Sequence, residues 1–194
     1  MDDVPVRQIR ARHDEETVTV YQAFRPEIAG PAAAEGRFPA AFSLDRTTWI
    51  KPSFRWLMHR SDWARAEGQE RVLGVVIRRS GFDAALAAAV LSSYKPGVHA
   101  SKADWQRELR RSPARVQWDP ERDLGLRPLA HRSLQLGLGG ALARRYTSDW
   151  LVRIDDLTDL ARELHATRDP ALLPPERPYP LDPATAARLG ASAG

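Results

Sequence analysis

The sequence predicts an α+β fold: a single domain with a mixed, largely antiparallel sheet flanked by helices. Strand-like and helix-like segments alternate irregularly along the 194 residues, without an internal repeat, which favours this class over a doubly wound fold. Hydrophobic residues make up 43% of the chain, enough for one buried core. After residue 168 the prolines become frequent. We therefore predict one domain over residues 1–168 and a proline-rich tail over residues 169–194.

The first third of the chain contains two predicted strands and two predicted helices. Thr17–Phe24 is rich in β-branched and aromatic residues, as strands are. The alanine-rich segment Pro26–Glu35 predicts a short helix. Thr47–Ile50 predicts a short strand that stops before a proline. Ser53–Trp63 then predicts a helix, because Ser53 suits the N-cap and three tryptophans follow one another at intervals of seven residues.

The middle of the chain begins with the longest apolar strand. Val72–Ile77 is almost continuously apolar, which is typical of a strand in the centre of a sheet. Phe82–Ser93 predicts an apolar helix, and Ala103–Arg110 a polar one. Val116–Trp118 predicts a strand that ends at Pro120.

The last elements are less regular. Ser133–Tyr146 mixes strand and helix character, and its glycines argue against one continuous helix. Trp150–Ile154 predicts a strand and Leu157–His165 a helix. Within the tail, Ala184–Leu189 predicts a short helix.

The composition excludes several classes of protein and site. There is no cysteine, so disulfide frameworks, thiolate zinc sites and cysteine nucleophiles are excluded. The histidines lack a metal-ligand spacing, and we expect no metal. No apolar run approaches the roughly 18 residues that cross a bilayer. The first residues lack the pattern of a signal peptide, so we expect a cytoplasmic protein with no membrane partner.

The basic residues point to an anionic partner. Lysine and arginine number 29, only three of them lysine, and the pI is about 9.8. Arginine presents a planar fork of donors that suits phosphate and carboxylate. The alternative explanation is a GC-rich genome that favours arginine codons. A nucleotide, DNA or RNA is therefore a permitted partner.

Polar residues gather in four segments where packing alone would not place them. These segments are Tyr21–Gln22, Thr47–Phe54 with the nearby His59–Ser61, Gln117–Arg122, and His131–Gly137.

These segments resemble those of a family that occurs in bacteria and fungi and is known as domain of unknown function forty-two ninety-one. The resemblance lies in four blocks between about Arg7 and Leu160. They are Val20–Ala23, Thr48–Phe54, Gln117–Arg122 and Arg132–Gln135. His13 departs from the family pattern, in which an aromatic tyrosine is expected. The resemblance implies no reaction.

Lys51 and Ser53 flank a proline at a predicted strand-to-helix turn. Backbone N–H groups at the helix start, together with the lysine charge, would suit a phosphate, and Arg60 could add a second cation. The alternative is a capped helix beside a solvated lysine.

Gln117, Asp119 and Glu121 alternate along an extended segment, so we expect them to project to one face. A carboxylate there could orient a ribose hydroxyl or stabilise a cationic transition state. The alternative is a turn in which Asp119 or Glu121 pairs with Arg122. We also expect Arg132 to bind an anion. Arg132 and Gln135 would share a face on a helix but not on a strand.

The domain size and irregular order of elements resemble the ADP-ribosyltransferase-like superfamily. That resemblance implies a transferase that uses NAD as co-substrate and carries Glu121 as its catalytic carboxylate, with Asp119 and Gln117 behind it. It implies a nucleotide-binding set comprising Arg10, Arg12, Tyr21, Gln22, Lys51, Ser53, Arg60, Arg132 and Gln135.

A second hypothesis is a nucleic-acid-binding or processing protein that does not use NAD. In that case the arginines contact phosphates and the four polar segments line a groove. A third is an interaction module without catalysis. The acceptor and the oligomeric state are not predicted.

Overall fold

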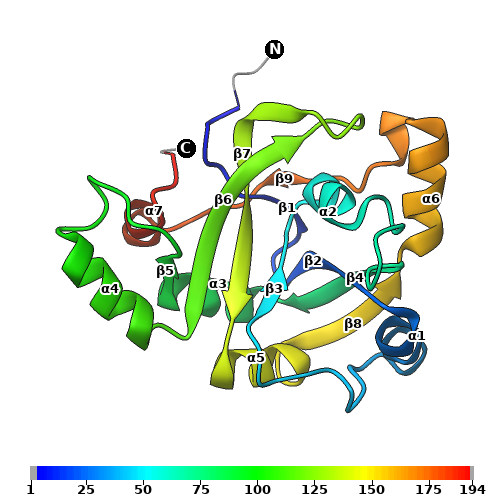
Figure 1. Cartoon of the computed structure of the whole chain (residues 1–194), viewed down its shortest axis with the longest axis horizontal. Coiled ribbons are helices and arrows are strands. Elements are labelled where there is room, and N and C mark those ends of the chain that lie inside the picture. The colour runs from blue at the N-terminus through cyan, green and yellow to red at the C-terminus, as the bar shows by residue number, and fades with distance from the viewer. Residues whose placement is uncertain (1–3, 193–194) are drawn as a thin grey trace.

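The computed structural model describes residues 4–192 as an α+β fold with two sheets (Figure 1). The first sheet is antiparallel throughout. Its strands, in spatial order, are β8 (Leu151–Asp156), β4 (Arg71–Arg78), β2 (Thr17–Phe24), β1 (Arg10–His13) and β9 (Arg177–Pro178).

The second sheet is mixed. Its strands, in spatial order, are β3 (Thr48–Ile50), β7 (Pro128–Leu138), β6 (Ala114–Arg122) and β5 (Ala89–Leu91). β6 and β7 form a long antiparallel hairpin, and β5 alone runs parallel to its neighbour. The predicted mixed, largely antiparallel arrangement is confirmed, although it is divided between two sheets.

Helices surround both sheets (Figure 1). They are α1 (Pro26–Glu35), α2 (Phe54–Ser61), α3 (Arg79–Ala88), α4 (Lys102–Arg111), α5 (Gly140–Thr147), α6 (Thr158–Thr167) and α7 (Pro183–Leu189), with one 3₁₀ turn, η1 (Pro170–Leu172). α3 contacts strands of both sheets, so the main core lies between them. No helix within residues 4–192 is long and apolar enough to cross a membrane.

β4 is an interior strand of the first sheet, in agreement with its apolar sequence. All residues from Val72 to Ile77 are buried, and the strand pairs with β2 on one side and β8 on the other. Burial on both faces explains why this run does not alternate between apolar and polar residues.

The two sheets are joined where β2 meets the chain just after β3. The backbone N–H of Tyr21 donates to the carbonyl of Lys51 over 2.7 Å, and the reverse bond spans 3.3 Å. Beside this pair lies the Gln22 side chain, only 4% exposed. Its Nε2 donates to Thr48 Oγ1 (2.9 Å) and to the Trp49 carbonyl (3.0 Å). Its Oε1 accepts a 2.7 Å bond from the hydroxyl of Tyr146. We call these contacts the Gln22 junction.

Two predicted boundaries were wrong. The predicted helix Phe82–Ser93 ends at Ala88, and the next three residues form β5, whose partner β6 satisfies their backbone groups. β6 in turn continues through Pro120. Since β5 pairs with β6 no further than Val116, the later part of β6 has a free edge, where a missing N–H costs no ladder bond. The register of β6 with β7 also shifts between Pro120 and Arg122.

The segment after residue 168 is packed into the fold. β9 pairs with β1, and the short helix predicted at its end is confirmed as α7. Tyr179 is 4% exposed and Leu189 is fully buried, both within the main core. The indole N–H of Trp118 donates to the Leu189 carbonyl over 2.9 Å.

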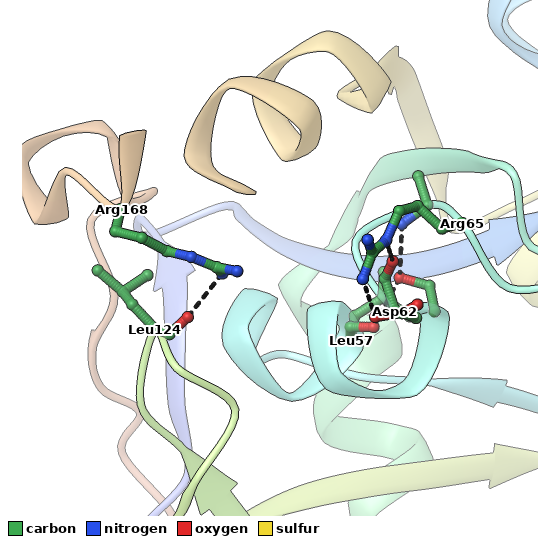
Figure 2. Close-up of polar contacts among 7 residues, drawn as sticks. Leu57, Asp62, Arg65, Leu124 and Arg168 are labelled. Atoms are coloured by element: carbon green, nitrogen blue, oxygen red, sulfur yellow. Dashed lines mark hydrogen bonds and ion pairs between the residues drawn. The ribbon is translucent and has the colours of Figure 1, made fainter. Parts of the chain in front are cut away.

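Helix α2 ends in a left-handed turn. Asp62, Trp63 and Ala64 have φ values of 48°, 56° and 63°, which are unfavourable for residues with a Cβ atom. Asp62 accepts a 2.7 Å bond from Arg65, and Arg168 from the end of α6 donates to the Leu124 carbonyl across the same region (Figure 2). Trp63 is 1% exposed beneath the Arg168 guanidinium, so its burial offsets the strain of the turn.

We predict that Leu189→Ala lowers the free energy of unfolding by about 2–5 kcal/mol, because it opens a cavity in the main core. Val152→Ala is the control: Val152 is 49% exposed and should change stability by less than about 0.5 kcal/mol. Urea unfolding followed by circular dichroism measures both. Equal effects of the two substitutions would mean that α7 does not contribute to the core.

Candidate functional site

Three polar side chains form a hydrogen-bonded group on one face of the β6–β7 hairpin. Gln135 Nε2 donates to Gln117 Oε1 and to Asp119 Oδ2, both over 2.7 Å. The cross-strand register places Gln135 opposite Gln117, while the intervening residues, such as Trp118, face the core. Gln117 and Asp119 therefore share a face, as their spacing predicts, and both remain partly exposed.

Lys51 belongs to the same region and is 7% exposed. Its Nζ donates to the Trp49 carbonyl over 3.1 Å and lies 5.5 Å from the centre of the Trp56 ring. Burial lowers the pKa of Lys51 to about 7, and repulsion from Arg60 adds to that effect, whereas Asp119 opposes it. Near neutral pH this lysine is a mixture of charged and neutral forms.

The last turn of α2 adds His59 and Arg60 to this group. Burial lowers the pKa of His59, with further lowering by the charges of Arg122 and Arg60, while Asp119 raises it. Asp119 is thus the anion that faces both Lys51 and His59. We call Lys51, His59, Arg60, Gln117, Asp119 and Gln135 the Asp119 cluster.

The start of helix α2 is occupied by side chains of the protein. Ser53 Oγ caps the helix by accepting from the N–H of Trp56 (3.2 Å) and donates to Glu121 Oε2 (2.6 Å). The N–H of Phe54 donates to Glu176 Oε1 over 2.7 Å. A carboxylate therefore occupies the position where the sequence suggested a phosphate.

The hydrogen-bond partners of Glu121 differ from those of Gln117 and Asp119. It is 3% exposed, and its Oε1 accepts a 2.8 Å bond from the N–H of Arg122 in addition to the Ser53 contact. Its carboxylate therefore contacts the start of α2, whereas Gln117 and Asp119 contact Gln135.

Glu176 is the site residue that sequence reasoning missed. It lies in the proline-rich segment, 122 residues from Phe54, whose N–H donates to it. No local pattern in the sequence indicates this contact. Burial raises the pKa of Glu176 to about 8, and the charge of Glu121 raises it further; the Phe54 N–H, Arg55 and Arg10 act in the opposite direction. Glu121 and Glu176 are thus two carboxyl groups at one helix start.

Tyr21 and Gln22 are both buried in this fold. Tyr21 is fully buried, packs edge-on against Phe54 at 5.3 Å between ring centres, and its hydroxyl has no hydrogen-bond partner within residues 4–192. Burial raises its pKa. Gln22 forms the junction described above. Gln22 Nε2 and Lys51 Nζ both donate to the Trp49 carbonyl, so the junction adjoins the Asp119 cluster.

The predicted arginines of the site divide between several places. Arg10 donates to Gln8 Oε1 (3.1 Å) and to the Glu176 carbonyl (3.3 Å), which places it near the start of α2. Arg12 is exposed on β1. Arg132 stands on a strand, on the opposite face from Gln135, and its Nη1 donates to the Trp118 carbonyl over 2.9 Å.

The cations of the site lack carboxylate partners. Among residues 4–192, the ion pairs engage other arginines, and neither Lys51, Arg10, Arg60 nor Arg132 forms one. The same residues contain no group of three or more histidine and carboxylate side chains that could hold a metal ion. An anion could therefore bind without displacing an existing ion pair.

Residues 8–179 match the family described as Domain of unknown function (DUF4291), and the chain belongs to that family. The match spans the Asp119 cluster, the start of α2 and Glu176. No curated protein matches the chain.

We predict that the stability of the wild type rises between pH 7 and about 10, relative to that of a Lys51→Met variant. The folded protein releases the Lys51 proton near pH 7, whereas the unfolded chain keeps it to about 10.5, so raising the pH favours the folded state in this interval. Melting temperatures across the interval test this. Lys102→Met, at an exposed position, should retain the wild-type pH profile. Parallel profiles for wild type and Lys51→Met would contradict the lowered pKa.

Proposed function

We propose that the protein is an ADP-ribosyltransferase-like enzyme that uses NAD to modify a nucleic acid or another acceptor. The observation that carries this proposal is the Asp119 cluster. It combines a partly exposed carboxylate, fixed by Gln135, with Lys51 and Arg60, cations that form no ion pair within residues 4–192. The α+β architecture of two sheets is compatible with it.

The carboxylate would act on the ribose. In ADP-ribosyl transfer the bond between ribose C1′ and the nicotinamide nitrogen breaks, and nicotinamide leaves with the bonding electrons. Positive charge develops on the ribose, and a fixed carboxylate stabilises it. The acceptor then bonds to C1′ and loses a proton. Asp119 is our candidate for this role, because it is more exposed than Glu121 and its orientation is held by a 2.7 Å hydrogen bond.

The cations would hold the pyrophosphate. Arg60 is exposed and presents a planar fork of donors that suits phosphate. Lys51 is partly neutral near pH 7, but a phosphate beside it would favour its charged form and so raise its pKa. In this proposal Lys51 takes up a proton when the nucleotide binds.

Glu121 has a supporting role in this proposal. It is buried and accepts hydrogen bonds from Ser53 and from the Arg122 backbone, which fixes the start of α2. Through α2 it positions His59 and Arg60.

We predict that Asp119→Asn lowers the rate of nicotinamide release from NAD by at least about 10²-fold, because it removes the charge that stabilises the transition state. The melting temperature should change little, since asparagine keeps the shape of the side chain. Glu121→Gln is the matched comparison: it should lower the melting temperature and retain most of the activity. Full activity of Asp119→Asn would remove this residue from the mechanism.

A second candidate function is nucleic-acid binding without NAD, which the unpaired arginines and the pI near 9.8 favour. A thermal-shift titration separates the two, because a ligand that binds the native state raises the melting temperature. We expect a rise with NAD or ADP-ribose that changes little with salt. A rise seen with a short single-stranded oligonucleotide alone, and lost at moderate salt, would favour the second function.

A further inference from the structure

A polar cavity lies along the free edge of β6, next to the Asp119 cluster. Its volume is 280 Å³, and it opens where β5 ends and the chain turns away toward α4. The polar residues that line it are Arg7, Ser92, Ser93, Lys95, Gln117 and Asp119.

Two cations, Arg7 and Lys95, line this cavity. Arg7 Nη1 and Lys95 Nζ lie 3.2 Å and 3.3 Å from the point where a Cβ atom on Gly190 would stand, so the two charged groups are close neighbours. Arg132 is close enough to lower the pKa of Arg7, although burial lowers it more. The pKa of Lys95 is likewise lowered, first by burial and then by the charge of Arg7. Like charges at short range raise the free energy of the empty site, and an anion would relieve that cost.

The donors of these cations are only partly used. Within residues 4–192 neither Arg7, Lys95 nor Arg132 forms an ion pair. Arg7 Nη1 has a long 3.5 Å bond to the Gly190 carbonyl, and Arg132 donates to the Trp118 carbonyl. A guanidinium carries five N–H donors and an ammonium three, so most remain free for a ligand.

Asp119 restricts the kind of anion that fits. Its Oδ2 accepts from Gln135, and Asp119 lines the same cavity as Arg7 and Lys95. This carboxylate would repel a bare phosphate that came close to it. It would accept a hydrogen bond from a sugar hydroxyl, and Gln117 beside it can donate or accept another. The pairing of cations with a hydroxyl acceptor suits a phosphate that carries a sugar.

We infer that this cavity binds a sugar phosphate, with Arg7 and Lys95 on the phosphate and Asp119 on a sugar hydroxyl. The inference goes beyond the proposed function, because such binding requires neither NAD nor turnover. Where both hold, the cavity places a second sugar phosphate beside the carboxylate that acts on NAD.

Isothermal titration of the full chain with ribose 5-phosphate tests the inference. We expect measurable binding to the wild type, weaker binding of inorganic phosphate, and none of ribose alone. Lys95→Ala should weaken ribose 5-phosphate binding about tenfold, the effect of one charged hydrogen bond. Lys102→Ala removes the same charge from an exposed position on α4 and should leave the affinity unchanged. Should Lys95→Ala be unstable, Lys95→Gln keeps the length of the side chain.

Asp119→Asn separates the two parts of the ligand. It should weaken ribose 5-phosphate binding and leave inorganic phosphate binding equal or tighter. Parallel titrations with AMP and with a 5′-phosphorylated oligonucleotide then show whether the natural sugar phosphate is free or belongs to a nucleotide or a strand end. No binding of ribose 5-phosphate, or equal affinities of Lys95→Ala and Lys102→Ala, would overturn the inference. Ribose 5-phosphate binding without nicotinamide release from NAD would contradict the proposed function alone.

Discussion

The arrangement of the two sheets depends on the hydrogen bonds of the Gln22 carboxamide. It is buried, and both its nitrogen and its oxygen are hydrogen-bonded, to partners on β3 and α5. Loss of one partner would leave a buried polar group unpaired, at a cost of about 1–3 kcal/mol. Because β3 leads directly into Lys51 and helix α2, the Gln22 junction also fixes where the Asp119 cluster lies. The same hydrogen bonds therefore join the two sheets and position the candidate site.

Burial around α2 favours the neutral forms of Lys51 and Glu176. Burial lowers the pKa of Lys51 to about 7 and raises that of Glu176 to about 8. Both shifts have the same physical cause, since a charge loses solvation when it leaves water. For Glu176 the nearby Glu121 adds to the shift, and one proton relieves the repulsion between the two carboxyl groups. A base and an acid that both titrate near neutrality thus flank the same helix.

Much of the fold follows from local sequence. β2 and β4 could be predicted because β-branched and apolar runs of that length suit strands, and α2 because Ser53 caps it. β5 was missed because its three apolar residues continue the alanine-rich pattern of α3, and only pairing with β6 makes them a strand. Pro120 was predicted to end β6, but the strand continues through it. A proline is tolerated there because that edge of β6 is unpaired, and the pairing of strands is a tertiary feature.

The site was predictable to a similar extent. The alternation of Gln117 and Asp119 placed them on one face, and their bonds to Gln135 agree with that. Glu121 bonds instead to Ser53, a partner 68 residues away along the chain that local alternation does not indicate. Tyr21 and Gln22 stood out as polar residues on an apolar strand, and that signal came from a buried junction. Glu176 could not be found, since its partner is distant in sequence.

The packing of the last segment has a consequence for how the chain folds during synthesis. β9 pairs with β1, Ser192 accepts from the N–H of Arg7, and Glu176 completes the start of α2. These contacts join segments far apart in sequence, so they cannot form until residues 176–192 have emerged from the ribosome. The contacts of Ser192 and Glu176 close loops of 185 and 122 residues. Closing such long loops is slow relative to local helix formation. A nascent chain would therefore hold β2, β4 and α2 for some time with an incomplete sheet edge, the state in which a chaperone would be most useful.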